Sequence, residues 1–151
     1  MRVKDIMMSE IATCSPSTDL ATVAMMMWNK DCGVVPVTDA EGKPVSVITD
    51  RDISIAGATQ HRLLSDIPVT AVKDGRIISC STEQDVKDAI KLMANAKVRR
   101  LPVVDGDGRL VGMLSMGDVV ANIPGGGKGE SSAELPYEDV INVLKEVYVH
   151  H

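Results

Sequence analysis

The chain has 151 residues, enough for one domain with a hydrophobic core or for two small halves that share one. Its hydrophobic content of 44% and charged content of 25% are typical of soluble globular proteins and exclude disorder as the default state. The net charge of -5 disfavours a nucleic-acid-binding protein, because such proteins present a dense basic surface to phosphates.

The cysteines and the N-terminal residues indicate the cellular compartment of the protein. The three cysteines show no CxxC spacing, which indicates free thiols in a reducing compartment. Residues 1–5 contain no apolar signal segment, and the nearby apolar run at residues 23–28 is too short to span a bilayer. These features predict a cytoplasmic protein that does not enter a membrane.

The first predicted helix follows a short lead-in at residues 3–8 and a short strand at residues 11–14. Ser17 or Thr18 is expected to cap this helix. Apolar residues at helical spacing form a single stripe that is expected to face a core. The stripe comprises Leu20, Val23, Ala24, Met27 and Trp28.

A hairpin and a second helix complete the first half. Strands are predicted for residues 34–37 and 45–48, joined by a turn at residues 39–42. Thr49 is expected to begin a helix that ends near Gly57. The order of elements is therefore β-α-β-β-α.

The same order returns 66 residues later, with strands predicted at 101–104 and 110–114 and a helix at 118–123. Thr82 is expected to cap the intervening helix, whose apolar face carries Val86, Ala89, Ile90, Met93 and Ala94. The matching pairs include Cys14 and Cys80, Asp19 and Asp85, Asn29 and Asn95, Pro36 and Pro102, Asp39 and Asp105, and Gly42 and Gly108. The chain is a tandem repeat.

The repeat divides the chain into four parts: a first motif at residues 1–62, a second at 63–123, a Gly-rich linker at 124–134, and an amphipathic helix with a tail at 135–151. The apolar side of the last helix requires a partner surface, either the repeat itself or a second subunit. That side carries Tyr137, Val140, Ile141, Leu144 and Tyr148.

Each repeat ends in an apolar strand followed by a hydroxyl residue and, three positions later, a carboxylate. The pairs are Thr49 with Asp52 and Ser115 with Asp118. This spacing suits a helix cap, in which both side chains satisfy backbone donors. It also suits a ligand, because a helix N-terminus attracts phosphate and a carboxylate can accept both hydroxyls of a ribose. The residues alone leave both explanations open.

The doubled pattern of Pro36-Val37, Asp39, Gly42, Val47-Ile48-Thr49 and Asp52 resembles the CBS domain, named after cystathionine β-synthase, over residues 1–123. The resemblance implies an α/β (α+β) fold of tandem β-α-β-β-α repeats packed sheet to sheet with pseudo-twofold symmetry, a Bateman module. It also implies two clefts for adenosine-containing ligands and modules that pair into a disc, and hence a homodimer.

The same resemblance implies that Thr49 and Ser115 contact phosphate and that Asp52 and Asp118 hold ribose hydroxyls. Arg99 and Arg100 stand where family members often carry a basic pair that contacts phosphates, so we expect the Ser115/Asp118 cleft to favour a phosphorylated ligand. The wider set of predicted contacts comprises Arg51, Thr13, Ser15, Val34, Val35, Ser79, Ser81 and Leu101.

The expected function is therefore a sensor that binds AMP, ADP or ATP, with S-adenosylmethionine and NADH as further candidates, and that relays ligand state to a regulated protein. A ligand-free dimerisation scaffold is the alternative. Catalysis is disfavoured, because His61 is the only histidine before the terminal pair and no catalytic or metal-binding set is visible. Nucleic-acid binding through Lys97, Arg99, Arg100 and Arg109 is disfavoured by the net charge.

Overall fold

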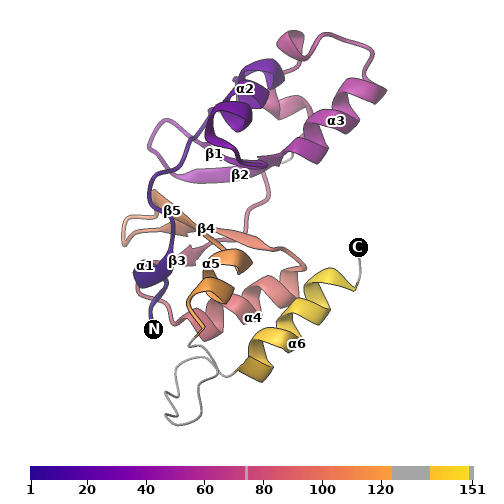
Figure 1. Ribbon diagram of the computed structural model, residues 1–151. Helices are drawn as coiled ribbons and strands as arrows, with labels where there is room; N and C mark the ends of the chain where they lie inside the picture. Colours follow the sequence, from indigo (N-terminus) through magenta and orange to yellow (C-terminus); the bar gives the residue numbers. More distant parts are fainter. Residues whose placement is uncertain (74, 124–136, 150–151) are drawn as a thin grey trace. The chain divides into compact units, whose positions relative to one another are not determined.

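The computed structural model describes residues 1–73, 75–123 and 137–149, which fold into two compact units (Figure 1). One unit is called the β1–β2 unit after its strands β1 (Val34–Thr38) and β2 (Pro44–Thr49), and it consists of the described residues of Glu10–Ile77 and Asp107–Leu110. The other is called the β3–β5 unit after β3 (Cys80–Ser81), β4 (Arg100–Val104) and β5 (Leu110–Ser115), and it consists of Met1–Ser9, Ile78–Gly106 and the described residues of Val111–His151.

Each unit contains the lead-in of the other repeat. The N–H of Leu20, at the start of the first repeat's helix, donates to the carbonyl of Ile67 at 2.9 Å. The equivalent N–H of Val86 donates to the carbonyl of Met1 at 3.0 Å. The two lead-ins are thus exchanged between the units. The motif boundary predicted between residues 62 and 63 separates the two sequence repeats, but it is not the boundary between the two compact units.

The β1–β2 unit is built on an antiparallel hairpin of β1 (Val34–Thr38) and β2 (Pro44–Thr49). At the turn, the Asp39 carboxylate accepts the N–H groups of Glu41 and Lys43, both at 2.9 Å. Gly42 has φ 79, a left-handed conformation that glycine adopts without strain. Residues 11–14, predicted as a strand, contribute only an isolated parallel bridge between Cys14 and Val37.

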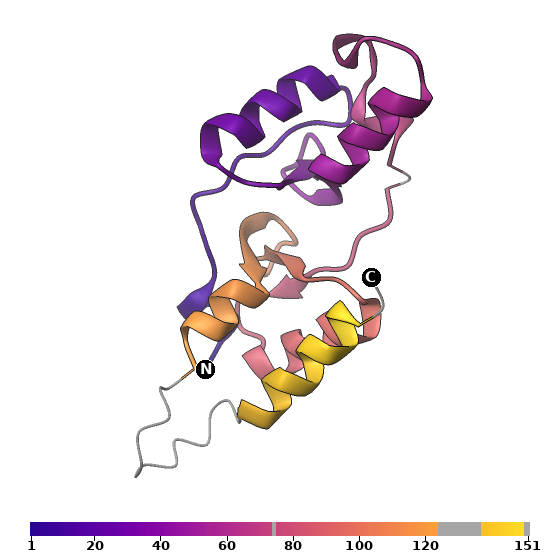
Figure 2. The same cartoon turned by 45° about the vertical axis from the view of Figure 1, so that its right-hand side comes forward.

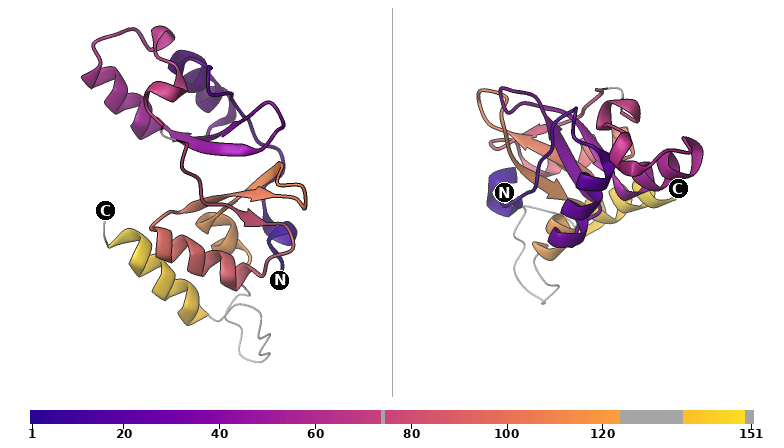
Figure 3. Two further views of the ribbon diagram at one scale, coloured as in Figure 1. Left: turned by 180° about the vertical axis from the view of Figure 1, so that it is seen from behind. Right: turned by 90° about the horizontal axis from the view of Figure 1, so that it is seen from above.

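Helices α2 (Leu20–Lys30) and α3 (Asp50–Thr59) lie on one face of this hairpin (Figures 1 and 3). Two 3-10 turns, η1 (Leu64–Asp66) and η2 (Val69–Ala71), follow α3. The unit's core is aliphatic apart from one thiol and one thioether. It contains Cys14, Leu20, Val23, Met27, Val35, Val37, Ile48, Ile53, Ala56, Ile67 and Val69.

Trp28 was predicted to face the core, and this prediction is wrong: its side chain is 81% exposed. The buried face of α2 carries Leu20, Val23 and Met27. With 3.6 residues per turn, Trp28 lies roughly 80° around the helix from Leu20, at the margin of the buried arc. A helical spacing identifies the stripe but not how far the covering surface extends around it.

The caps predicted for the two long helices are also wrong by a few residues. Asp19, not Ser17 or Thr18, caps α2, because its carboxylate accepts the N–H of Thr22 at 2.9 Å. Asp85, not Thr82, caps α4 (Val86–Ala96). In both helices the residue immediately before the first turn supplies a carboxylate, which the hydroxyl residues farther upstream cannot replace.

The β3–β5 unit contains a three-stranded sheet in the order β3 (Cys80–Ser81), β4 (Arg100–Val104) and β5 (Leu110–Ser115). Strand β3 runs parallel to β4. The short helices α1 (Val3–Ile6) and α5 (Met116–Ala121) belong to the same unit.

Helix α6 (Tyr137–Tyr148) packs along α4, as Figures 1 and 2 show. The repeat itself is therefore the partner of this helix within the chain, one of the two options left by the sequence. The buried side chains are Val140, Val143 and Val147, whereas the exposed Tyr148 lies outside that face. The predicted linker at residues 124–134 falls outside the described residues.

The core of this unit joins the sheet, α4, α5 and α6. It contains Val3, Cys80, Val86, Ala89, Ile90, Met93, Leu101, Val103, Leu114, Met116, Val119, Val140, Val143 and Val147. Among the residues that the structure describes, no helix is both long enough and apolar enough to cross a bilayer.

Candidate ligand sites at the two strand–helix junctions

Thr49 and Asp52 form a capping box at the junction of β2 and α3. The N–H and the hydroxyl of Thr49 donate to Asp52 Oδ2 at 2.8 and 2.9 Å. The N–H of Asp52 donates back to Thr49 Oγ1 at 3.1 Å. The helix-cap explanation of this pair is therefore correct as a description of local structure.

Ser115 and Asp118 repeat this geometry at the junction of β5 and α5. The N–H and hydroxyl of Ser115 donate to Asp118 Oδ2 at 2.8 and 2.6 Å, and the N–H of Asp118 donates to Ser115 Oγ at 3.1 Å. The box uses one carboxylate oxygen. Within the described residues Oδ1 of Asp118 accepts no hydrogen bond, so capping leaves an acceptor for a ligand.

Lys73 distinguishes the first junction from the second. Its Nζ lies 3.0 Å from Asp52 Oδ2. Burial opposes ionisation of Asp52, but the Lys73 ammonium together with the N–H and hydroxyl of Thr49 outweighs it, so the pKa of Asp52 lies below its ordinary value. The sequence contains no signal for this pair, since the chain must turn back after η2 to bring Lys73 to α3.

We expect Lys73→Met to raise the pKa of Asp52, because the substitution removes the cation while burial remains. Ionised Asp52 stabilises the fold above its unfolded pKa of about 3.9, and this stabilisation is lost as pH falls through the folded-state pKa. In the variant the loss begins at a higher pH. Carboxyl-carbon NMR titration measures the shift, with Lys43→Met, an exposed turn residue, as the control. An unchanged Asp52 titration in Lys73→Met would contradict the assignment.

The second junction opens into a pocket of about 230 Å³. Its lining comprises Arg99, Arg100, Ser115, Met116, Gly117 and Tyr148. The sequence predicted the two arginines and Ser115, and the structure brings all three together. Two guanidinium groups and a hydroxyl are suited to an anion, and this volume holds a phosphate group but is small for a whole nucleotide.

Sequence reasoning missed three residues of this pocket: Met116 and Gly117, which follow Ser115 directly, and Tyr148, which is distant in the chain. The Arg99 guanidinium carbon lies 5.3 Å from the centre of the Tyr148 ring, a cation–π contact. Tyr148 was assigned only to the apolar side of the last helix. The docking of α6 on α4 carries it to the pocket, and no local pattern near Arg99 could have predicted that.

Two of the predicted ligand contacts have no exposed surface. Val35 and Leu101 are 0% exposed and belong to the two hydrophobic cores, whereas Val34 is half-buried. Side chains alternate between the faces of a strand, and Val35 and Leu101 occupy the core-facing positions of β1 and β4. The structure therefore gives no support to an adenine ring resting on these two residues.

The hydroxyl residues at the strand ends take part in local turns. Ser15 Oγ lies 3.1 Å from the hydroxyls of both Ser17 and Thr18, and the N–H of Ser81 donates to Gln84 Oε1 at 3.3 Å. Thr13 is exposed and Ser79 is half-buried. Arg51 is exposed in the first turn of α3, and the structure does not bring it to the Arg99–Tyr148 pocket.

The buried thiols are poor nucleophiles. Burial raises the pKa of Cys14 and that of Cys80 to about 11 each. Both thiols are therefore protonated near neutral pH, and the thiolate is the reactive form. In residues 1–73, 75–123 and 137–149, no three His, Cys, Asp or Glu side chains gather closely enough to hold a metal ion.

Comparison with known proteins identifies the family. The model for the CBS domain matches residues 3–58 and 61–125. The CBS domain-containing protein YhcV of Bacillus subtilis is 35% identical over 120 residues, which are 80% of this chain and 84% of YhcV.

Solved structures agree with this match. The CBS-domain containing protein ATU1752 from Agrobacterium tumefaciens has a TM-score of 0.69 and 28% identity, covering 82% of this chain and 100% of that chain. The structure of CBSX2 in complex with AMP has a TM-score of 0.68 and 28% identity, covering 80% of this chain and 93% of that chain. The chain therefore belongs to the CBS domain family and contains two CBS motifs.

Proposed function

We propose that the chain is a regulatory module that binds an adenine nucleotide at the second junction and relays its presence to another protein. The observation that carries the proposal is the gathering of Arg99, Arg100 and Ser115 around one pocket, beside a carboxylate with a free oxygen. The guanidinium groups would bind phosphate, and Asp118 would accept the ribose hydroxyls.

The positive charge of the two arginines favours those candidate ligands that carry phosphate. AMP, ADP and ATP bring the phosphate that two arginines favour, and NADH brings a diphosphate. S-adenosylmethionine has no phosphate and carries a positive sulfonium, which the arginines would repel. CBSX2, which is 28% identical, was solved in complex with AMP, and this supports AMP as a candidate ligand.

The first junction is the weaker candidate for a nucleotide. Lys73 already neutralises Asp52, and Gly33 stands at the repeat position of Arg99. A ribose that used both oxygens of Asp52 would have to displace the ammonium. We therefore assign the nucleotide to the Ser115/Asp118 junction first.

A ligand-free scaffold is the second candidate, because both capping boxes are complete without any ligand. In either case the homodimer expected from the family resemblance and the cytoplasmic location stay predictions. Sedimentation velocity of the full chain, with and without AMP, tests whether the chain is a homodimer.

Thermal unfolding of the full chain with AMP, ADP, ATP, NADH and S-adenosylmethionine tests the proposed function. A ligand at about 100 times its dissociation constant adds about 2.7 kcal/mol to stability, so the midpoint should rise with AMP and remain unchanged with S-adenosylmethionine. The AMP shift should disappear in Arg99→Ala and persist in Arg51→Ala, a matched exposed arginine of the other unit. A chain that responds to none of the five would favour the scaffold.

A further inference from the structure

Arg99 links the second junction to helix α6. It lies between the end of α4 and the start of β4, and its carbonyl accepts the N–H of Met116, the first residue of α5, at 3.0 Å. Its guanidinium lies over the ring of Tyr148, the last residue of α6. The backbone of Arg99 is therefore held at the junction, and its side chain is oriented by α6.

Within the described residues, the guanidinium groups of Arg99 and Arg100 have no anionic partner. Both arginines are exposed, and no ion pair or side-chain hydrogen bond joins either of them to another residue of the described part of the chain. Neighbouring cations repel each other, and an anion between them would relieve this repulsion and accept charge-assisted hydrogen bonds from both. The pair is therefore suited to bind a phosphate.

The contact with Tyr148 leaves the hydrogen-bond donors of Arg99 available to a phosphate. A cation–π contact uses the charge of the guanidinium, and the ring accepts none of its five N–H groups as a conventional hydrogen bond. Ser115 lines the same pocket, whose volume of about 230 Å³ holds a phosphate group. The ring thus restricts the motion of the Arg99 side chain without using the donors that a phosphate requires.

The position of the Tyr148 ring depends on the docking of α6. Val147, the residue before it, is 0% exposed and shares the core of the β3–β5 unit with the other buried valines of this helix. The N–H of Val149 donates to the carbonyl of Lys145 at 3.0 Å, so the helical hydrogen bonds continue past Tyr148. The ring therefore meets Arg99 because the last turn of α6 is docked.

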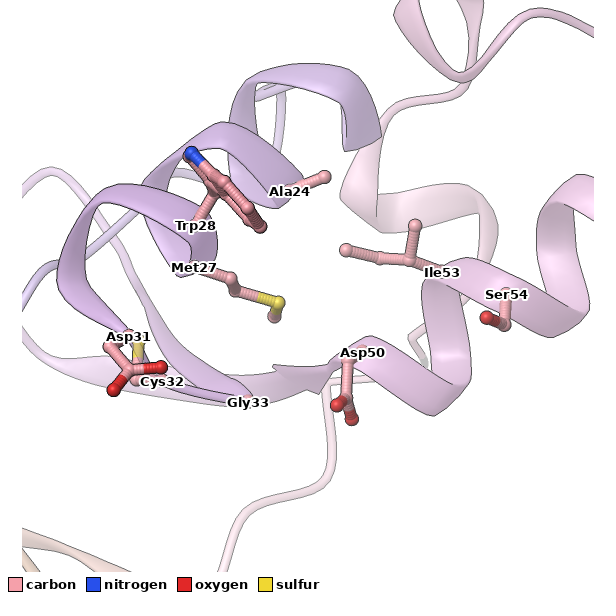
Figure 4. Close-up of a pocket in the computed structure, with 9 residues that line it drawn as sticks. All are labelled: Ala24, Met27, Trp28, Asp31, Cys32, Gly33, Asp50, Ile53 and Ser54. Atoms are coloured by element: carbon pink, nitrogen blue, oxygen red, sulfur yellow. The ribbon is translucent and has the colours of Figure 1, made fainter.

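The first repeat has the same backbone contact but lacks the arginine. Gly33 and Asp50 stand at the repeat positions of Arg99 and Met116, and the N–H of Asp50 donates to the carbonyl of Gly33 at 3.0 Å. Figure 4 shows Gly33 with the Asp50 carboxylate at the start of α3. The described lining of this pocket includes the carboxylates of Asp31 and Asp50 and no arginine or lysine. Arg99 and the docked helix that orients it thus occur together, at the second junction.

We infer that Tyr148 is a positioning residue for the nucleotide phosphate and that α6 is the element through which the bound nucleotide is relayed. This rests on the proposed function, because the phosphate is that of the proposed nucleotide. A phosphate held by Arg99 keeps the guanidinium beside the ring, so the nucleotide stabilises the docked state of α6. By linkage, docked α6 raises the affinity for the nucleotide by the same factor. A cation–π contact at an exposed site corresponds to a factor of about two to five.

Calorimetric titration of the full chain with AMP tests the positioning role. Tyr148→Ala should weaken AMP binding about two- to fivefold, because the ring that orients Arg99 is lost. Tyr148→Phe keeps the ring and should bind AMP as tightly as the native chain. Tyr137→Ala is the control, because it removes a ring that is 68% exposed at the other end of α6, and it should leave the affinity unchanged.

Hydrogen exchange of the α6 amides tests the relay. Saturating AMP should slow this exchange about two- to fivefold in the native chain and in Tyr148→Phe, since exchange requires local opening of the helix. In Tyr148→Ala, saturated at a higher AMP concentration, α6 should exchange equally fast with and without AMP. Slowing of the same size in Tyr148→Ala would reflect general stabilisation of the unit and would overturn the relay through Tyr148.

The same variants distinguish failure of this inference from failure of the proposed function. If AMP binds to the native chain, is lost in Arg99→Ala and binds unchanged to Tyr148→Ala, the proposed function stands and the inference is overturned. Tighter binding to Tyr148→Ala would overturn it in favour of a ring that blocks the pocket. A native chain that binds no AMP would overturn both.

Discussion

Replacing Asp118 by Asn is expected to weaken AMP binding tenfold to about a hundredfold while leaving the fold intact. The Asn side-chain oxygen can still accept the Ser115 N–H that now bonds to Asp118 Oδ2 at 2.8 Å, so the cap is retained. The ribose would lose a charged acceptor. Hydrogen bonds to charged groups contribute about 1.5–3 kcal/mol, which corresponds to that range of affinity. Isothermal titration calorimetry with AMP measures the change.

Asp52→Asn is the matched control, because Asp52 forms the same capping box in the other unit. It should leave AMP affinity unchanged if the nucleotide binds at the second junction. Asp118→Ala should lose both affinity and stability, since alanine cannot cap. If Asp118→Asn binds AMP as tightly as the native chain, and only Asp118→Ala lowers the unfolding midpoint, Asp118 is a cap and nothing more.

Val147→Asp is expected to release α6 from α4. Val147 is 0% exposed in the core of the β3–β5 unit, and full burial of a valine contributes about 1.5–3 kcal/mol. The carboxylate would lose this contribution and would need a partner that the aliphatic core cannot supply. A loss of about 3 kcal/mol corresponds to a roughly hundredfold faster hydrogen exchange of the α6 amides.

Val149→Asp provides the control with the same chemical change, two residues later. Its native valine is 73% exposed, so exchange in α6 should stay as it is in the native chain. Mass spectrometry of exchanged peptides resolves α6 from α4 in both variants. Unchanged protection of α6 in Val147→Asp would mean that the helix does not depend on this face. The docking of α6 on α4 would then be wrong.

The hairpin and the two junctions could be predicted from the sequence because their determinants are local. Asp39 and Gly42 specify the turn, and a hydroxyl three residues before a carboxylate, directly after an apolar strand, correctly predicted the capping boxes of α3 and α5. The same spacing at Thr82 and Asp85 did not give such a box, because Asp85 itself is the cap of α4. The extension of the α3 and α5 boxes to ligand binding came from the family resemblance and stays a prediction that the Asp118→Asn experiment tests.

Contacts between distant segments could not be predicted in this way. Lys73 reaches Asp52 only after the chain turns through η1 and η2, and the exchange of lead-ins pairs Leu20 with Ile67. The prediction that Trp28 is buried was wrong for a related reason. Helical periodicity indicates which residues share a face, but not which part of that face another element covers.

The sequence by itself determined the hairpin turns and the helix starts at Thr49 and Ser115, because each depends on spacing within a few residues, and the 66-residue offset revealed the tandem repeat. The proximity of Arg99 and Arg100 to the second junction was predicted from the family resemblance. Only the tertiary structure decided that α6 packs along α4 and that Tyr148 meets Arg99. The apolar stripe of α6 requires burial but is compatible with several surfaces. The choice among them depends on shape and charge that the folded units alone present.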